Sequence, residues 1–490
     1  MTKTVVFIFQ TIQTLVIGLA LAASAHWLLG EEYASRQQAK ILAPIEGYFY
    51  GTTHRDDITV LLIDDASLNK IGITWPAPYA YEARLLRAVG RYQPKSVFLD
   101  IFFKDNRKAA DIGQLVQEIC ALKAQGIEVY LGATKNDAGQ FTLRDELEAT
   151  SGKCFKKTAL YFLPDSVDRT AWSYPISPFG QSGAALAINP AAVEMYNDLT
   201  KTTLVPKGAE SSLALTWGSV EAKQGIPWTE QIDGEAPSER YCRGFQGMRE
   251  MIPGALRQYG LRHYEKPICV FHETLLAQDL STNSAAEEAI VARRIKGKSV
   301  MVGVALTQSQ DHVLTPLHGR IPGVYLHAMA LDNLLVYGAD YPEETSLHFD
   351  KARSHLMLLA FLMTSIVLIG LLKSSTESLR HRMNKRMEVS ARRYIRNATR
   401  SKSGLHRWLI LAIAQILYIG AIILKKIGVI LLITFATGGI ALFGASVFHI
   451  GFISTFSIAM FVVAAEWLEI KEKLVKQFVL KPPINRPTSF

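Results

Sequence analysis

The sequence lacks the short motifs that usually carry enzyme chemistry. It has no Gly-x-Ser-x-Gly elbow, no His-Glu-x-x-His motif and no Cys-x-x-Cys pair. The tripeptide Gly297-Lys298-Ser299 imitates the end of a phosphate-binding loop, but it precedes its strand and lacks the upstream glycine. Internal repeats and low-complexity tracts are absent as well. The sequence therefore predicts that the protein is not an enzyme and needs no cofactor.

Acidic residues are scarce outside residues 30–350. Only five of the 44 Asp and Glu residues lie there, against 21 of the 53 Lys and Arg residues. The net charge of +9 thus belongs to the flanking segments, so it gives no reason to expect a nucleic-acid partner. Ten basic residues lie between Arg380 and Arg407, which makes this segment cytoplasmic by the positive-inside rule. Region 30–350, on the other side of the adjacent apolar run, is then expected on the periplasmic or extracellular side.

What the flanks do contain is long apolar runs, at residues 5–29, 355–372, 408–424 and 428–468. Such runs exclude a purely soluble protein and predict a multi-pass protein of the bacterial inner membrane. Ala23-Ser24-Ala25 resembles a signal-peptidase site, so a cleaved signal competes with an uncleaved anchor. Four and five spans both remain open, because the tail after the last run is basic. The expected order is an anchor (1–29), the large domain (30–350), a transmembrane helix (354–373), a basic segment (374–407), two or three membrane helices (408–468) and a tail (469–490).

The basic segment 374–407 alternates cationic and apolar residues at spacings compatible with an amphipathic helix. Such a helix can lie on anionic membrane lipid, or it can dock an acidic protein partner. A solvated loop is the simpler alternative. The residues expected to make lipid or partner contacts are Arg380, Arg382, Lys385, Arg386, Arg392, Arg393 and Arg396.

All four cysteines lie in region 30–350. An even number confined to one region is typical of disulfides in an oxidising compartment. Among the three connectivities, pairing of sequence neighbours is favoured: Cys120 with Cys154, and Cys242 with Cys269. Buried free thiols are the alternative, because cysteine is common in protein cores.

Short apolar runs in region 30–350 predict strands. Helical patterns such as 81–92 separate several of them, which is typical of a mostly parallel sheet covered by helices, an α/β domain. The segment 206–253 is richer in Gly, Pro and charge, and we interpret it as an insertion or a helical subdomain. The expected strands are 58–63, 96–99, 127–131, 159–163 and 299–304.

Three aspartates, Asp64, Asp65 and Asp100, follow expected strands. Ligands bind open α/β sheets at the ends of strands, and carboxylate oxygens suit a divalent cation. The simpler alternative is that these side chains cap helices and fix turns. Whether they hold a metal ion stays open.

Three further candidates lie in loops or after a later strand. The Trp75-Pro76 pair predicts a rigid loop whose ring either packs or stacks on a ligand. Asp311 and His327 follow the strand at 299–304 and are ligand candidates, as is His312. A hydrogen-bonded histidine near a helix start is the alternative, because their spacing is specific to no metal.

Three stretches in the same order resemble the second class of CHASE domains, extracytoplasmic sensory modules associated with bacterial cyclases and histidine kinases. Residues 58–103 carry the Asp64-Asp65 and Trp75-Pro76 pairs. Residues 211–218 (SSLALTWG) resemble the family's Ser-Leu-Ala-Leu helix start. Residues 298–335 carry Asp311, Gly323-Val324 and His327-Ala328 and resemble its closing part. The resemblance covers about residues 30–345.

Two departures from that family limit what the resemblance implies. Tyr79-Ala80-Tyr81 stands where the family usually has an Arg, so an anionic-ligand role of that Arg is in doubt. Family members often continue into a cytoplasmic output domain, whereas 22 residues follow Leu468 here. The sequence predicts a membrane sensory protein, a homo-oligomer, that signals through a separate protein partner. A structural scaffold in an oligomeric cell-envelope assembly is the alternative.

Overall fold

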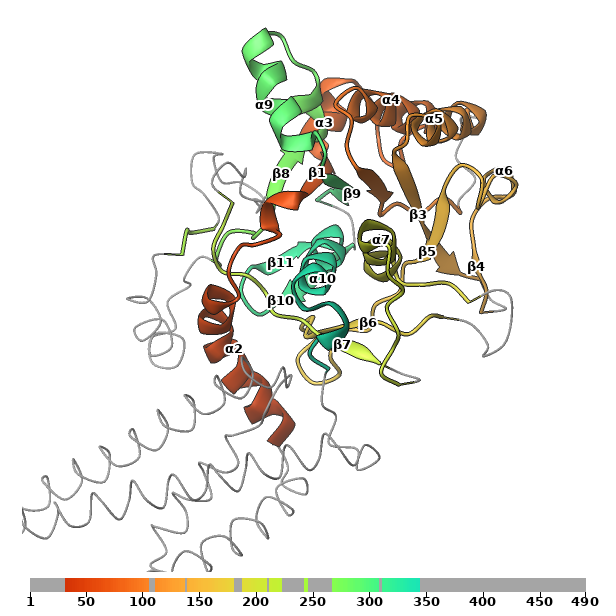
Figure 1. Ribbon diagram of the computed structural model, residues 1–490. Helices are drawn as coiled ribbons and strands as arrows, with labels where there is room; N and C mark the ends of the chain where they lie inside the picture. Colours follow the sequence, from red (N-terminus) through yellow and green to blue (C-terminus); the bar gives the residue numbers. More distant parts are fainter. Residues whose placement is uncertain are drawn as a thin grey trace, which may run out of the picture. The chain divides into compact units, whose positions relative to one another are not determined.

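The computed structural model describes residues 31–104, 111–136, 139–179, 187–208, 211–222, 242–245, 267–307 and 311–343 (Figure 1). The described residues from Ala39 onward belong to one compact unit. No helix among the described residues is long and apolar enough to cross a membrane. The four apolar runs and the basic segment 374–407 lie outside the described residues, so those predictions stay predictions.

A seven-stranded sheet forms the centre of this unit, in the order β4-β3-β2-β9-β1-β8, with β5 also paired to β3. Every strand pair in it is parallel except β3 with β4. The predicted mostly parallel sheet is therefore confirmed. The strands are β1 (Ile58–Asp64), β2 (Ser96–Leu99), β3 (Glu128–Lys135), β4 (Phe141–Thr142), β5 (Lys156–Ala159), β8 (Glu273–Leu276) and β9 (Ser299–Ala305).

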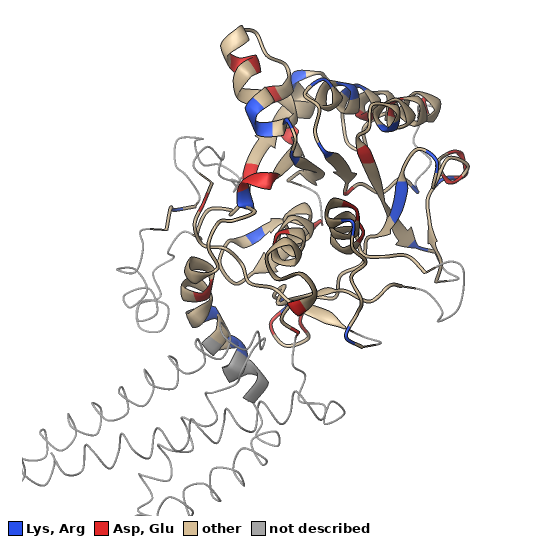
Figure 2. Ribbon diagram, in the orientation of Figure 1, with Lys and Arg blue, Asp and Glu red and all other residues tan. Residues whose placement is uncertain are grey.

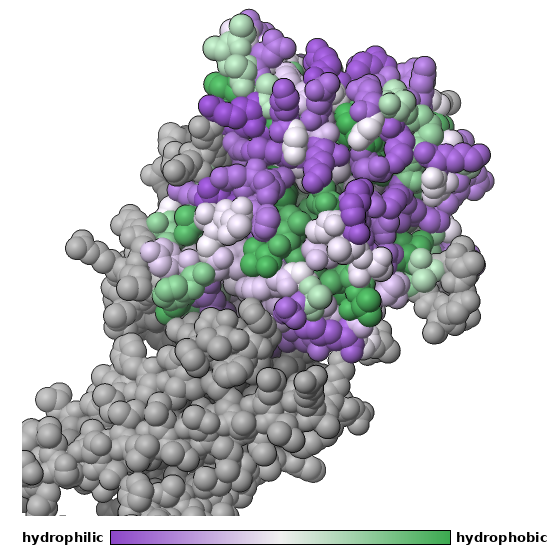
Figure 3. Space-filling model, in the orientation of Figure 1, coloured by the Kyte–Doolittle hydropathy of each residue, from purple (hydrophilic) through white to green (hydrophobic). Residues whose placement is uncertain are grey.

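Helices cover both faces of the sheet because its central strands are apolar on both sides. In β1, Leu61 and Ile63 pack on one face while Val60 and Leu62 pack on the other. The first face carries α3 (Asp65–Lys70), α4 (Tyr79–Gly90), α5 (Ile112–Ala124), α6 (Asp145–Glu148) and α9 (Ala285–Ile295). Charged residues occur along α4, α5 and α9 (Figure 2), and the surface over α4 and α9 is mostly hydrophilic (Figure 3).

The second face carries α7 (Ala191–Thr200), α10 (Val324–Tyr337) and part of α2 (Glu31–Phe49). Two small antiparallel pairs complete it: β6 (Ser173–Pro175) with β7 (Ser212–Ala214), and β10 (His312–Thr315) with β11 (Gly319–Pro322). Helix α10 is almost entirely buried, from Val324 through Leu334. It is the most enclosed helix among those described, which makes it a rigid element between the sheet and α2.

Four of the five expected strands are confirmed, and the fifth is displaced. The strand expected at 159–163 is β5, Lys156–Ala159. The sequence pattern placed this strand too late because β5 begins with two lysines, which are untypical of an apolar strand. In the structure both lysines pair with carboxylates on neighbouring helices. Lys156 contacts Glu194 of α7 at 2.9 Å, and Lys157 contacts Glu148 of α6 at 2.9 Å. An edge strand tolerates such side chains.

The expected helix start at 211–218 is wrong. Residues Ser212–Ala214 form β7, and Leu213 of this strand is fully buried in the second core. Pairing with β6 overrides the helical preference of Leu and Ala. Most of the remainder of 206–253, interpreted as an insertion or helical subdomain, lies outside the described residues.

Both predicted disulfides are confirmed. Cys120 of α5 is bonded to Cys154 just before β5, and Cys242 is bonded to Cys269 just before β8. The Cα atoms lie 4.6 and 4.8 Å apart. The two bonds fit an oxidising compartment.

Candidate functional site at the carboxyl edge of the sheet

The carboxyl ends of β1, β2 and β9 meet at one edge of the sheet. After β1 the chain enters α3 and α4 on the first face, whereas after β9 it passes through β10 and β11 to α10 on the second face. Neighbouring strands whose connections leave to opposite faces define the place where open α/β sheets bind ligands. The candidate aspartates of the sequence all lie at this edge.

Asp64 and Asp65 hold local structure. Asp64 caps α3, because its Oδ1 accepts a hydrogen bond from Ser67 N at 3.0 Å and another from the Ser67 hydroxyl. Asp65 Oδ2 accepts from Thr307 N at 2.8 Å and from Thr307 Oγ1 at 2.6 Å. Asp65 therefore connects the end of β1 to the end of β9. Asp64 Oδ1 and Asp65 Oδ2 thus have structural roles, in capping α3 and in joining the two strand ends.

Asp100 differs from the other two aspartates. It directly follows β2, its residue is 7% exposed, and its backbone N donates to Val302 O at 2.8 Å. Among the described residues, no hydrogen-bond partner reaches its buried Oδ2 atom. Burial, and then the nearby charge of Asp311, raise the pKa of the Asp100 carboxyl well above its usual range. The buried site therefore favours the protonated form of this carboxyl more than water does.

His327 lies beside Asp100 on α10. Its Nε2 atom is 3.9 Å from Asp100 Oδ1, and burial lowers the pKa of the ring to about 3. Its Nδ1 atom is 2.8 Å from the Tyr174 hydroxyl, which also accepts a hydrogen bond from Ala192 N at 3.2 Å. Because Tyr174 already accepts that bond, it can donate its proton to Nδ1. The neutral ring then carries its own proton on Nε2, facing Asp100.

Asp311 completes the group from the segment that precedes β10. It is partly buried, and desolvation raises the pKa of its carboxyl to about 6. Gly323 N donates to Asp311 O at 3.1 Å, and a Cβ atom at 323 would lie 2.4 Å from Asp311 Oδ1. Glycine therefore lets the start of α10 pack directly against this aspartate.

The structure places the other candidates elsewhere. Trp75 is partly buried and packs against the core of the first face. His312 opens β10, opposite Pro322 of β11. Within the described ranges, no three His, Cys, Asp or Glu side chains gather so that they could hold a metal ion.

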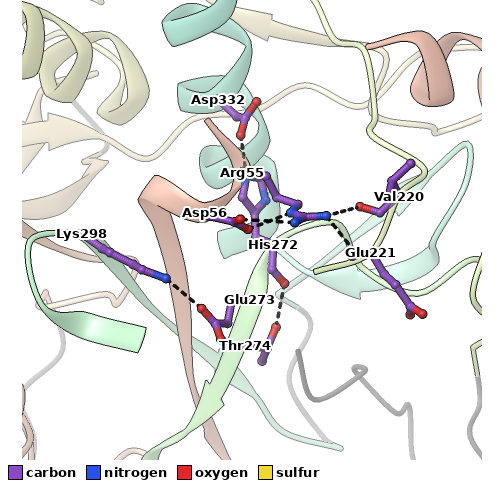
Figure 4. A network of polar contacts seen from close by, with 9 residues as sticks. All are labelled: Arg55, Asp56, Val220, Glu221, His272, Glu273, Thr274, Lys298 and Asp332. Atoms are coloured by element: carbon purple, nitrogen blue, oxygen red, sulfur yellow. Dashed lines mark hydrogen bonds and ion pairs between the residues drawn. The ribbon is translucent and has the colours of Figure 1, made fainter. Parts of the chain in front are cut away.

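Sequence reasoning missed a second polar cluster, which Asp332 of α10 forms with His272 (Figure 4) and with Tyr50, the residue that follows α2. Asp332 Oδ1 accepts from the Tyr50 hydroxyl, and its Oδ2 lies 3.1 Å from His272 Nε2. Burial and the charge of Asp332 raise the pKa of Tyr50. No motif joins residues so far apart, but one signal existed: Asp332 is the one acidic residue in the mostly apolar stretch of α10, Val324–Tyr337.

Beside this cluster, further polar side chains fix the start of β1 and the strand β8. Arg55 donates to Val220 O at 3.2 Å and to Glu221 O at 2.8 Å. Glu273 of β8 pairs with Lys298 at 2.9 Å (Figure 4). It also pairs with Arg294 at 3.1 Å. The end of α2, α10 and the edge strand β8 are thus joined by polar contacts.

A covered parallel sheet with two disulfides defines an α/β domain of an extracytoplasmic compartment. The family model of the CHASE2 domain matches residues 16–372, more than half of the chain, and the chain belongs to this family of extracellular sensory domains. The resemblance seen in the sequence is confirmed. Neither a curated protein nor a solved structure gives a significant match.

Proposed function

We propose that this CHASE2 domain detects a ligand at Asp100, Asp311 and His327 and that the protein signals through a separate partner. The observation that carries the proposal is the buried Asp100 Oδ2 atom, which has no partner among the described residues and lies beside a second carboxyl. A polar atom buried in this way costs free energy, which a ligand can recover. Two carboxyls favour a ligand that supplies N–H donors, such as an amine or an amide.

Helix α10 is the route by which such a ligand would act. A donor placed between the two carboxyls stabilises their ionised forms, so binding lowers the pKa of Asp100. Helix α10 carries His327 near the ligand and Asp332 five residues later, about 7.5 Å along the helix. A shift of α10 therefore changes the contact of Asp332 with Tyr50, at the end of α2. The ligand can shift this equilibrium only by its difference in affinity for the two states.

The membrane arrangement belongs to the same proposal. Region 30–350 lies outside the cytoplasm, the apolar runs cross the inner membrane, and segment 374–407 contacts lipid or a partner on the cytoplasmic side. The uneven charge of the chain supports this orientation. The protein is not an enzyme in this proposal, and the partner supplies the output.

A ligand screen on the full-length protein in lipid nanodiscs tests the site. Amino acids, amines and amides are compared by the shift that each produces in the thermal unfolding temperature. A true ligand stabilises the wild type and loses most of its effect in the Asp100→Asn and His327→Gln variants. Asp145→Asn is the matched control, because Asp145 is an exposed carboxylate on α6. A ligand that stabilises all four proteins equally binds elsewhere, and this result would count against the site.

Crosslinking in native membranes tests the partner. The full-length protein is compared with a variant in which the basic residues between Arg380 and Arg407 are replaced by Gln. Recovery of a kinase, cyclase or other regulator only with the basic residues present supports signalling to a partner. Recovery of the protein itself and envelope structural proteins alone would favour the scaffold function instead.

A further inference from the structure

Three aromatic rings surround the ammonium group of Lys135, the last residue of β3. Lys135 Nζ lies 4.3 Å from the ring centroid of Tyr161, 5.5 Å from that of Phe141 and 5.6 Å from that of Phe179. All three distances are within the roughly 6 Å at which a ring face attracts a cation. We call the group of Phe141, Tyr161 and Phe179 the aromatic box.

The box is built from separate parts of the chain that are fixed against each other. The Phe179 ring lies 5.1 Å from the Tyr161 ring and 5.5 Å from the Phe141 ring. Phe141 is buried in β4 and lies opposite Lys135 in the strand ladder. Phe179 exchanges two backbone hydrogen bonds of 2.9 Å with Ile188. Backbone pairing that does not depend on the Lys135 side chain therefore holds Phe141 and Phe179 in place.

Lys135 is the loosely held part of this arrangement. Its residue is exposed, and its ammonium group forms no ion pair or hydrogen bond within the part of the chain that the structure describes. A lysine ammonium is strongly hydrated, which makes it a poor guest for an apolar box. A quaternary ammonium has no N–H group to hydrate and presents methyl groups to the rings. Boxes of this kind recognise such ligands in other proteins.

The position of the box also points to a ligand. It lies at the carboxyl end of β3, the same edge of the parallel sheet at which Asp64 and Asp100 lie. Leu99 is opposite Leu131 in the ladder, so Lys135 lies about 13 Å farther along its strand than Leu99 lies on β2. The box and the Asp100 group are therefore separate sites.

We propose that the aromatic box binds a quaternary ammonium group and that Lys135 occupies the box until such a ligand displaces its side chain. The ligand class is a compound with a trimethylammonium head group, either a free solute or a lipid head group. This site goes beyond the carboxyl site of the proposed function and does not depend on it.

Calorimetric titration with choline tests the proposal. The full-length protein is placed in nanodiscs of phosphatidylethanolamine and phosphatidylglycerol, and 3,3-dimethylbutan-1-ol serves as the uncharged ligand of the same shape. We expect choline to bind and the alcohol to bind at least about fivefold more weakly. Lys135→Gln removes the internal competitor and tightens choline binding roughly two- to fivefold. Tyr161→Leu and Phe179→Leu keep apolar bulk but weaken binding to a similar extent.

Lys70→Gln is the control, because Lys70 is an exposed lysine on α3 outside the aromatic box, so the same exchange there leaves choline affinity unchanged. Equal binding of choline and the alcohol overturns the proposal, as does unchanged affinity in both leucine variants. Absence of choline binding to Lys135→Gln overturns it as well, because the box is then only packing for Lys135. If a leucine variant shows no thermal unfolding transition, it is not folded and its titration is not used. The proposal is then tested by the Lys135→Gln titration and by the comparison of choline with the uncharged alcohol. Competition by added phosphatidylcholine would identify a lipid head group as the source, and its absence a free solute.

Discussion

At the scale of single residues, three acids that look alike in the sequence have different environments. Asp64 caps a helix, Asp65 joins two strand ends, and Asp100 is buried beside a second carboxyl. The sequence located all three at strand ends, because an acid after an apolar strand is visible in the pattern. It did not separate them, since burial and hydrogen bonding depend on the distant residues Thr307 and Asp311.

The pKa of Asp311 predicts a pH-dependent effect of Asp311→Asn. The folded-state pKa, about 6, is above the ordinary aspartate value of 3.8, so this group stabilises the fold at low pH. That contribution is lost as the pH rises through 6. Asparagine does not ionise, so the variant should gain up to about 3 kcal/mol relative to the wild type between pH 4 and pH 7.5. The check is urea unfolding of both full-length proteins, followed by tryptophan fluorescence at the two pH values.

The same comparison contains its own control. Loss of hydrogen bonds on substitution affects both pH values alike, whereas the ionisation effect changes between them. The buried His327 has a lowered pKa and works in the opposite direction, but it is present in both proteins. Asp100 adds to the expected change, because Asp311→Asn removes a charge that raises the pKa of Asp100. A stability difference that stays constant from pH 4 to pH 7.5 would contradict the raised pKa of Asp311.

At the scale of elements, β9 and α10 pack so closely that one position accepts only glycine. A Cβ atom at Gly303 would lie 2.5 Å from Val324 Cβ, which belongs to the first turn of α10 and cannot rotate away. Gly303→Ala should therefore destabilise the protein by about 1–3 kcal/mol. Thermal unfolding of the full-length variant measures this effect.

Gly113→Ala is the matched control for that substitution. A Cβ atom at Gly113 meets no other atom within 4 Å, and the residue lies in α5. Alanine is the better helix former, so this change should stabilise the protein by about 0.5–1 kcal/mol. If both glycine variants unfold at the temperature of the wild type, this result would contradict the close packing of β9 against α10.

The contact of α2 with α10 gives a second prediction at this scale. Tyr50→Phe removes the hydroxyl that donates to the buried Asp332 and leaves one carboxylate oxygen without that donor. We expect a loss of about 1–3 kcal/mol in the free energy of unfolding. Tyr48→Phe, at an exposed site in the last turn of α2, should change it by less than about 0.5 kcal/mol. Urea unfolding of the two variants compares them, and equal effects would contradict a structural role of the Tyr50 hydroxyl.

The sequence predicted the central elements better than the peripheral ones. Strands β1, β2 and β9 are buried on both faces and therefore appear as uninterrupted apolar runs. β8 begins with Glu273, whose charge is neutralised by Lys298 and Arg294, and no apolar run marks it. Strand β7 looks like a helix start because its pairing with β6 is a tertiary contact. Local sequence patterns therefore identified the strands that are buried on both faces. The conformation of β7 and β8 depends on long-range contacts, which a local pattern does not show.

At the scale of the whole molecule, the charge asymmetry predicts which regions face the cytoplasm. Val205 is 74% exposed, and the cysteines present in the wild-type chain are bonded to each other. A cysteine introduced by Val205→Cys should react with a membrane-impermeant maleimide in intact spheroplasts. A cysteine introduced by Ser390→Cys should react only after the membrane is permeabilised. Reaction of both in intact spheroplasts would overturn the proposed orientation.

The position of β1 in the sheet has a consequence for how the domain is made. β1 is an early strand of the chain, yet its two neighbours, β8 and β9, lie more than 200 residues later. A chain leaving the ribosome or a translocation channel from its N-terminus therefore carries β1 unpaired until β8 has emerged, at residue 276, and without its second neighbour until residue 305. Parallel pairing at such distances is slow. We therefore expect the yield of folded domain to depend more on how well chaperones protect β1 during export than on the stability of the native state.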